Sequence, residues 1–179
     1  MRRIMIALVV MVSLVSVPAF AARLDNYATV KLGAYSPRAH FLRGQYFSRG
    51  IDGEVAFGRY FNRHLAGEFG LGYFKTTTGS NQITVVPVTV TGKGILPLGK
   101  FELYAGAGIG EYFTKAELYS QSYNNAALGW HILAGVDFNV NPYLFLGVET
   151  KYLWVKPSFS DWDSRLDGAT ATANLGFRF

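Results

Sequence analysis

Glycine occupies every second position of the segment Gly106-Ala107-Gly108-Ile109-Gly110. Closely spaced glycines can bind the phosphates of a dinucleotide, but only in a turn between a strand and a helix whose amino terminus faces the phosphate. This segment continues into Glu111-Tyr112-Phe113, which keeps the alternation and offers no helix. We therefore expect these glycines to lie inside a strand and expect no cofactor.

Histidine is the next residue type that could do chemistry, and the chain has three, His40, His64 and His131. No two of them have the spacing of metal ligands, and the chain has no cysteine, so no metal site is expected. His131 would be a catalytic base only if a nucleophile lay beside it. The sequence places no serine or aspartate partner there, so we expect no catalytic residue and interpret His131 as part of a polar network.

A third group of chemically capable residues is the basic and aromatic segment 36–50, which carries Arg38, Arg43 and Arg49. Guanidinium groups form charge-assisted, bidentate hydrogen bonds to phosphate, so these arginines are candidate contacts for phosphate groups. The net charge of +5 and the pI near 9.5 could also suggest nucleic acid. The basic residues are scattered rather than clustered, so no nucleic-acid partner is expected.

The first 21 residues have the three-part pattern of a secretory signal peptide. Arg2 and Arg3 precede an apolar run over 4–17, and the small residues Ala19 and Ala21 flank a candidate cleavage site. A transmembrane helix is the alternative, but it needs about 20 apolar residues. We expect a signal peptide over 1–21 and a single mature domain over 22–179.

The remaining chain has the alternation of apolar and polar residues that is typical of β-strands. The predicted strands, eight in number, are 27–35, 51–61, 65–74, 83–95, 100–112, 127–138, 143–154 and 169–179. They are joined alternately by tight turns and by longer polar connections. The tight turns are expected at 62–64, 97–99 and 139–142, and the longer loops at 36–50, 76–82, 114–125 and 155–168.

The two faces of these strands differ in charge. One face is apolar apart from Arg59 and Glu111, which we expect near strand ends. The other face is rich in glycine and carries the charges Lys31, Glu54, Glu68, Lys93, Glu102, His131, Asp137, Glu149, Lys151 and Arg178. A water-soluble barrel would place charges outside, so this pattern predicts a membrane-spanning barrel with a polar network in its lumen.

Three segments of these strands resemble a known family. They are Val86-Pro87-Val88-Thr89-Val90, Leu103-Tyr104-Ala105-Gly106-Ala107-Gly108-Ile109-Gly110 and Leu175-Gly176-Phe177-Arg178-Phe179. The chain resembles small bacterial outer-membrane β-barrel proteins of the OmpA-like and OmpW-like type. The resemblance implies an eight-stranded, antiparallel, up-and-down transmembrane β-barrel. Both termini would be periplasmic and the long loops extracellular, and Phe177 and Phe179 would form the signal read by the barrel-assembly machinery.

Function is less constrained than fold. An eight-stranded barrel is just wide enough to be filled by its own side chains, which excludes a water-filled general porin. We expect a non-enzymatic barrel, with OmpW-like uptake of small hydrophobic compounds as the leading hypothesis. The alternatives are a surface recognition or adhesion barrel that acts through four extracellular loops, and an outer-membrane lipid-modifying enzyme. The phosphate partner expected at Arg38, Arg43 and Arg49 is lipopolysaccharide.

Counting residues upward from the short turns predicts two charged layers in the lumen. The lower layer would hold three positive and three negative side chains, namely Lys31, Lys93 and Arg178 with Glu68, Glu102 and Asp137. The upper layer would hold Glu54, His131, Glu149 and Lys151. Because an unpaired charge in a confined space is costly, we expect pairing within the lower layer to plug the barrel.

Overall fold

The computed structural model of the protein describes residues 25–37, 50–78, 81–118, 121–155, 158–159, 162–163 and 167–179. The strands in these ranges are β1 (Asn26–Pro37), β2 (Gly50–Asn62), β3 (Leu65–Thr78), β4 (Asn81–Leu98), β5 (Phe101–Leu118), β6 (Gln121–Asn139), β7 (Leu144–Val155), β8 (Ser158–Phe159), β9 (Trp162–Asp163) and β10 (Gly168–Arg178). Within these ranges, no helix is long and apolar enough to cross a membrane.

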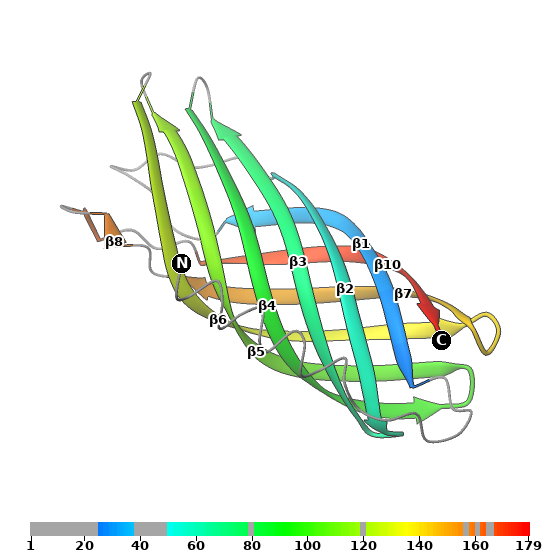
Figure 1. Cartoon of the computed structure of the whole chain (residues 1–179). Helices are drawn as coiled ribbons and strands as arrows, with labels where there is room; N and C mark the ends of the chain where they lie inside the picture. Colours follow the sequence, from blue (N-terminus) through cyan, green and yellow to red (C-terminus); the bar gives the residue numbers. More distant parts are fainter. Residues whose placement is uncertain are drawn as a thin grey trace.

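Eight of the strands close into an antiparallel barrel in the order β1-β10-β7-β6-β5-β4-β3-β2, and β8 and β9 form a separate two-stranded sheet (Figure 1). The first and last barrel strands pair from Tyr27 and Arg178 to Pro37 and Gly168. Beyond that ladder, Asn26 and Phe179 exchange two backbone hydrogen bonds of 2.9 and 3.2 Å. The predicted eight-stranded up-and-down barrel is therefore confirmed. Because β1 and β10 pair along this ladder, their backbone hydrogen-bonding groups are satisfied there.

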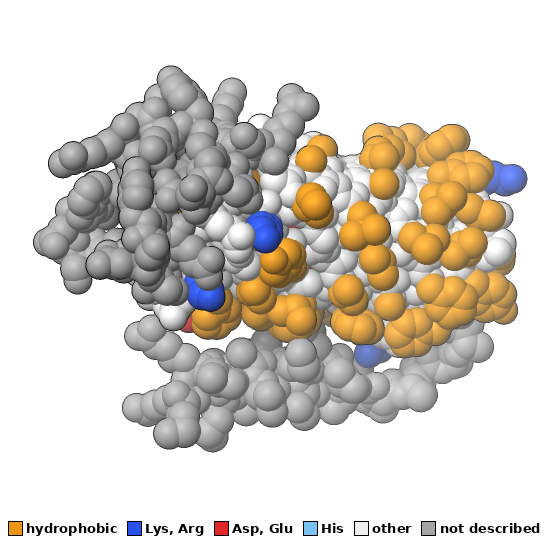
Figure 2. Space-filling view, turned by 90° about the horizontal axis from the view of Figure 1, so that it is seen from above, with side chains coloured by type: hydrophobic (Ala, Val, Ile, Leu, Met, Phe, Trp, Pro, Cys, Tyr) orange, Lys and Arg blue, Asp and Glu red, His pale blue; other side chains and the backbone are white. Residues whose placement is uncertain are grey.

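The alternation of the sequence separates an apolar outer surface from a polar interior. Large apolar side chains such as Leu32, Phe57, Ile109 and Val148 are exposed on the outside. Figure 2 shows hydrophobic side chains spread over one face of the barrel, with a few positively charged side chains toward the margins of that region. All ten charged or histidine side chains assigned to the lumen point inward, and nine of them are buried, while Glu102 at the lower mouth is partly buried.

The three tight turns have local causes in the sequence. The Oδ1 atom of Asn62 accepts a hydrogen bond of 2.8 Å from the backbone of His64, and Asn141 accepts two such bonds from the backbone of Tyr143 and Leu144. Such side-chain bonds replace the ladder bonds where the chain reverses. Gly99 has a φ of 66°, a left-handed conformation that only glycine adopts without strain.

Strands β3 to β6 are longer than the sequence suggested. The β2–β3 ladder ends at Ile51 and Lys75 and the β6–β7 ladder ends at Gly129 and Val155, but β5 and β6 stay paired to Leu118 and Gln121. We call the protruding part the extension; it comprises residues 76–78, 81–84, 115–118 and 121–128. Figure 1 shows β3 to β6 rising past the ends of the other barrel strands.

The extension corrects two predictions. The loops expected at 76–82 and 114–125 are wrong, because all but four of those residues continue the strands. Glu111 is also not near a strand end, since β5 continues for seven residues to Leu118. The polar residues there were interpreted as loop, but a strand that stands clear of lipid needs no apolar face.

Candidate functional site

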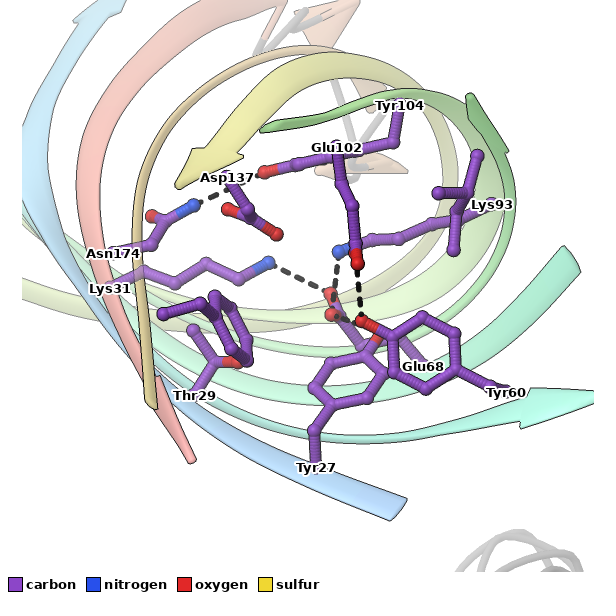
Figure 3. Close-up of a pocket in the computed structure, with 12 residues that line it drawn as sticks. Tyr27, Thr29, Lys31, Tyr60, Glu68, Lys93, Glu102, Tyr104, Asp137 and Asn174 are labelled. Carbon is purple, nitrogen blue, oxygen red and sulfur yellow. Dashed lines mark hydrogen bonds and ion pairs between the residues drawn. The ribbon is translucent and has the colours of Figure 1, made fainter. Parts of the chain in front are cut away.

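The middle of the lumen is occupied by six paired charges, which we call the central network. Its members are Lys31, Lys93 and Lys151 with Glu54, Glu68 and Glu149, and each is more than nine-tenths buried. Lys31, from β1, lies at its centre: its Nζ atom is 2.8 Å from Glu54, 2.8 Å from Glu68 and 3.0 Å from Glu149. Figure 3 shows Lys31 and Lys93 reaching from opposite walls toward Glu68.

The other two lysines complete the charge balance. Lys93 lies 2.5 Å from Glu68 and 3.4 Å from Glu149, and Lys151 lies 2.5 Å from Glu54. Tyrosine hydroxyls occupy further carboxylate oxygens, with Tyr27 donating to Glu68 over 2.9 Å and Tyr104 donating to Glu149 over 3.1 Å. Three positive and three negative side chains are thus joined from most sides of the barrel.

A second group of polar side chains closes the short-turn end, and we call it the mouth cluster. Arg178 forms an ion pair of 3.0 Å with Glu102 and donates a hydrogen bond of 2.7 Å to Asn139. Tyr60 donates to Glu102 over 3.2 Å, and the Arg178 guanidinium lies 4.6 Å from the ring centre of Phe145. The cluster joins β2, β5, β6 and the last strand.

This arrangement corrects the predicted layering. Lys31 contacts Glu54 and Glu149, which were assigned to the upper layer, while the Arg178–Glu102 pair is separate from Lys31. Asp137 makes no ion pair among the described residues, and its Oδ1 atom has no hydrogen-bond partner there. The cause is the shear of the barrel: Lys31 faces Glu54 directly in the β1–β2 register, although the two lie at different residue counts from their turns.

The other half of the lumen holds a large apolar cluster, beside the buried polar side chains of Asp52, Thr76 and Thr114, and the sequence analysis missed both features. The upper apolar cluster consists of Tyr35, Phe74, Ile83, Val85, Tyr112, Ala127, Leu153 and Val155, all buried. The ring centres of Tyr35 and Phe74 are 4.5 Å apart. The signal was present, because these residues have the same strand parity as the lumen charges but lie nearer the long-loop ends.

His131 lies between these two groups and is fully buried. Its Nε2 atom is 2.9 Å from the hydroxyl of Thr91, and its register partner on β7 is Leu153 of the upper apolar cluster. A catalytic base needs access for a substrate, and the surrounding packing gives none. The geometry fits a side chain that packs the interior rather than one that transfers protons to a ligand.

Little free space remains among these side chains. A cavity of about 10 Å³ lies between the central network and the mouth cluster, with Thr29, Ile95, Asp137 and Asn174 in its wall (Figure 3). That volume has room for about one water molecule. The described interior therefore contains charged, aromatic and aliphatic packing from one end to the other.

Inward-facing rings are packed over glycines on the neighbouring strand. The register pairs Tyr27 with Gly58, Tyr104 with Gly135 and Phe145 with Gly176. A Cβ atom added to these three glycines would lie 2.0, 2.4 and 2.0 Å from the ring of its partner. Glycine thus provides the space that lets large rings fit inside a narrow barrel.

Other predicted sites fall partly outside the described residues. Arg38, His40, Arg43 and Arg49 lie there, as does the expected signal peptide over 1–21. His64 lies at a turn, with its Nδ1 atom 3.2 Å from the carbonyl oxygen of Ile95. Within the described ranges, no three histidine or carboxylate side chains are grouped to hold a metal ion.

Comparison with solved structures relates this barrel to small outer-membrane proteins. Neisserial surface protein A is 14% identical with a TM-score of 0.66, over 86% of this chain and 96% of that one. OprG from Pseudomonas aeruginosa is 12% identical with a TM-score of 0.60, over 89% and 98% of the two chains. Ail of Yersinia pestis is 14% identical with a TM-score of 0.56, over 87% and 97%. At these identities the likeness concerns the fold.

Comparison at the level of sequence gives the family. No curated protein sequence matches the chain significantly. The family model described as outer membrane protein beta-barrel domain matches residues 7–179, nearly the whole chain. Together with the closed barrel of eight strands, the apolar exterior and the charged interior, this match shows that the chain belongs to the outer membrane protein beta-barrel domain family of bacterial outer-membrane proteins.

Proposed function

We propose that this protein is a non-enzymatic surface recognition barrel, closed to solutes, that binds its partner through the extension. One observation carries the proposal: the lumen is filled from the mouth cluster to the upper apolar cluster, while the wall formed by β3 to β6 continues past the barrel. A filled barrel with a protruding sheet is suited to contact rather than to passage.

The interior supports recognition over uptake of a small hydrophobic compound. Uptake through the barrel needs an apolar pocket of ligand size near the long-loop end. The apolar side chains at that end pack on one another instead, with Tyr35, Phe74 and Tyr112 each at most 2% exposed. Enzymatic function is disfavoured by the buried position of His131 beside Thr91.

The edge of the extension supplies a surface for binding. Residues 121–128 of β6 pair with β5, but no described strand pairs with their other side; the β8–β9 hairpin lies against β6 without joining its ladder. This stretch, Gln-Ser-Tyr-Asn-Asn-Ala-Ala-Leu, contains neither charge nor proline. Charged residues and proline usually protect an exposed strand edge from pairing with another chain. An edge that lacks them can accept a strand from a partner. The proposed partner is an extended segment of another protein.

The proposal places the extension outside the cell. Bacterial barrels have short periplasmic turns and longer extracellular connections. The tight turns lie at one end of this barrel and the extension at the other (Figure 1). Two similar structures are named for a surface protein and for an attachment invasion locus protein, and those names agree with a role at the cell surface.

Orientation is tested first, with single cysteines in this cysteine-free chain. We expect an impermeant thiol reagent to label intact cells at cysteines replacing Gln45, Ser80, Ser120 or Asp161. Cysteines replacing Arg63, Gly99 or Asn141 should be labelled only after the outer membrane is opened. Labelling of the second group on intact cells would reverse the orientation.

Recognition is tested with a charged edge. Ala126, exposed on β6, is replaced by lysine, and the matched control places lysine at Val140, exposed in a short turn. We expect bacteria that produce the unmodified protein to adhere to host-cell layers, Ala126→Lys to abolish the gain, and Val140→Lys to preserve it. Equal adhesion by all three, together with steady conductance in lipid bilayers, would contradict the proposal and favour a conduit.

A further inference from the structure

One carboxylate is left over when the charges of the central network and the mouth cluster are paired. The central network balances three lysines with three glutamates, and Arg178 pairs with Glu102. Asp137, on β6, is 8% exposed, forms no ion pair with a described residue, and has an Oδ1 atom that accepts no hydrogen bond there. The two groups and Asp137 together therefore carry one net negative charge.

The position of Asp137 makes this excess charge costly. Its register partner on β5 is Glu102, so two carboxylates face each other across neighbouring strands, and like charges in that position are destabilising. Arg178 contacts Glu102 and thus compensates only one of the two. Because an uncompensated charge in a confined space is unfavourable, a positively charged ligand beside Asp137 would stabilise the barrel.

Asp137 borders the cavity between the central network and the mouth cluster, which has space for such a ligand. Its volume of about 10 Å³ is room for one water molecule or one ion of similar size. Figure 3 shows the Asp137 carboxylate turned toward the interior of this space. Glu102 also lies in the wall, and its side chain is 17% exposed at the short-turn end. A cation could therefore reach Asp137 without passing the central network.

Two neutral oxygens in the cavity wall can contact the same ligand. The Oγ1 atom of Thr29 is buried and has no hydrogen-bond partner among the described residues. The Tyr27 hydroxyl donates its proton to Glu68 over 2.9 Å, so its oxygen keeps lone pairs for a cation. Both residues lie on β1, which is separated from β6 by β10 and β7 in the barrel order. A ligand held by all three side chains would link two distant walls of the lumen.

The surroundings of the cavity select the kind of cation. Within the described ranges, no three histidine or carboxylate side chains are grouped, so a transition metal or Ca²⁺ would lack its usual ligands. The ammonium groups of Lys31 and Lys93 also line the wall; each contacts Glu68, but both oppose a second positive charge on the ligand. Alkali cations are bound in proteins largely by neutral oxygens. One uncompensated negative charge thus matches one monovalent ion.

We propose that the cavity binds a single alkali cation, Na⁺ or K⁺, through Asp137, Thr29 and Tyr27. The ion neutralises the remaining carboxylate and ties β1 to β6 across the lumen, so the stability of the closed barrel depends on it. This site is independent of the extension and of which end of the barrel faces the cell exterior. The proposed function can therefore fail while this proposal holds, and the reverse.

The test is urea unfolding of the full mature chain in vesicles of uncharged phosphatidylcholine. NaCl and KCl are compared with choline chloride at the same ionic strength, so that screening of other charges stays constant. We expect the equilibrium constant for unfolding to be roughly tenfold lower in either alkali salt, the effect of an ion present at about ten times its dissociation constant. Excess ²³Na relaxation in NMR spectra, reversed by added KCl, reports binding directly.

The variants separate the ion from general effects of salt. We expect Asp137→Asn, which keeps the shape and removes the charge, to lose both the difference between salts and the excess relaxation. The matched control is Asp52→Asn, because Asp52 is 7% exposed and does not line the cavity; it should respond like the unmodified protein. Thr29→Val should weaken the response without abolishing it, and it tests the site even if Asp137→Asn fails to assemble.

Three results would overturn the proposal. The first is equal stability of the unmodified protein in alkali and choline salts. The second is an equal response to Na⁺ in the unmodified protein and in Asp137→Asn. The third is unfolding that depends on pH through Asp137 but not on Na⁺ or K⁺, because a proton rather than an alkali cation would then neutralise this carboxylate.

Discussion

Replacement of Lys31 by methionine is the sharpest test of the packed lumen. Lys31 is 1% exposed and contacts Glu54, Glu68 and Glu149 at 2.8 to 3.0 Å. Methionine nearly keeps the volume but removes the charge, so three buried carboxylates would share only Lys93 and Lys151. Removing one partner of a buried ion pair costs about 3–5 kcal/mol, and we expect the free energy of unfolding to fall by that amount.

The assay is urea unfolding in lipid vesicles, followed by heat-modifiable gel mobility and tryptophan fluorescence. Lys100→Met, at an exposed turn, is the control and should change stability by less than about 0.5 kcal/mol. Adding Glu68→Gln to Lys31→Met restores the charge balance of the central network, with two positive and two negative side chains. The double variant should therefore be more stable than Lys31→Met alone. A Lys31→Met protein within about 1 kcal/mol of the unmodified barrel would refute the buried network, because the cited cost is at least about 3 kcal/mol.

Three further predictions concern the ends and the packing of the barrel. Arg178→Ala should lower the free energy of unfolding by about 3–5 kcal/mol, yet single-channel conductance should stay low because the central network and upper apolar cluster remain; a large steady current would show that the mouth cluster alone closes the lumen. Gly147→Ala should cost about 1–3 kcal/mol, since its Cβ would lie 1.9 Å from Asp137 Oδ1, whereas Gly92→Ala, with its nearest atom at 4.0 Å, should unfold like the unmodified protein. Deletion of Phe179 should reduce the amount of heat-modifiable barrel in outer-membrane fractions, because it removes the backbone pair that ends the closing seam; undiminished assembly would contradict that role.

The fold could be predicted because alternation fixes which side chains face lipid. The parity of Lys31, Glu68 and Glu149 placed them inside, and the structure has them there. Parity says nothing about height, however, because the shear between strands is a property of the closed barrel. The contacts of Lys31 with Glu54 and Glu149 therefore could not be obtained by counting from the turns.

The strand ends were harder to predict for a different reason. Polar segments such as 76–82 fit a loop and an exposed strand equally well, because a strand outside the membrane has polar residues on its outer face. The upper apolar cluster was overlooked because inward apolar residues such as Tyr35 and Phe74 look like lipid-facing ones until the parity is followed to the strand ends. Contacts between strands that are distant in the sequence determine both the strand ends and the upper apolar cluster. The composition of a segment does not reveal those contacts.

The rings packed over glycines have a consequence for how the barrel finds its register. A strand that slips by two residues keeps every apolar side chain toward lipid, so the hydrophobic effect cannot detect the error. The pairs Tyr27–Gly58, Tyr104–Gly135 and Phe145–Gly176 do detect it, because the slipped ring would meet a side chain instead of open space. The register between β1 and β2, between β5 and β6, and between β7 and β10 is thereby fixed. Since the register shift around the barrel and the number of strands together determine its radius, these rings help to set the width of the barrel.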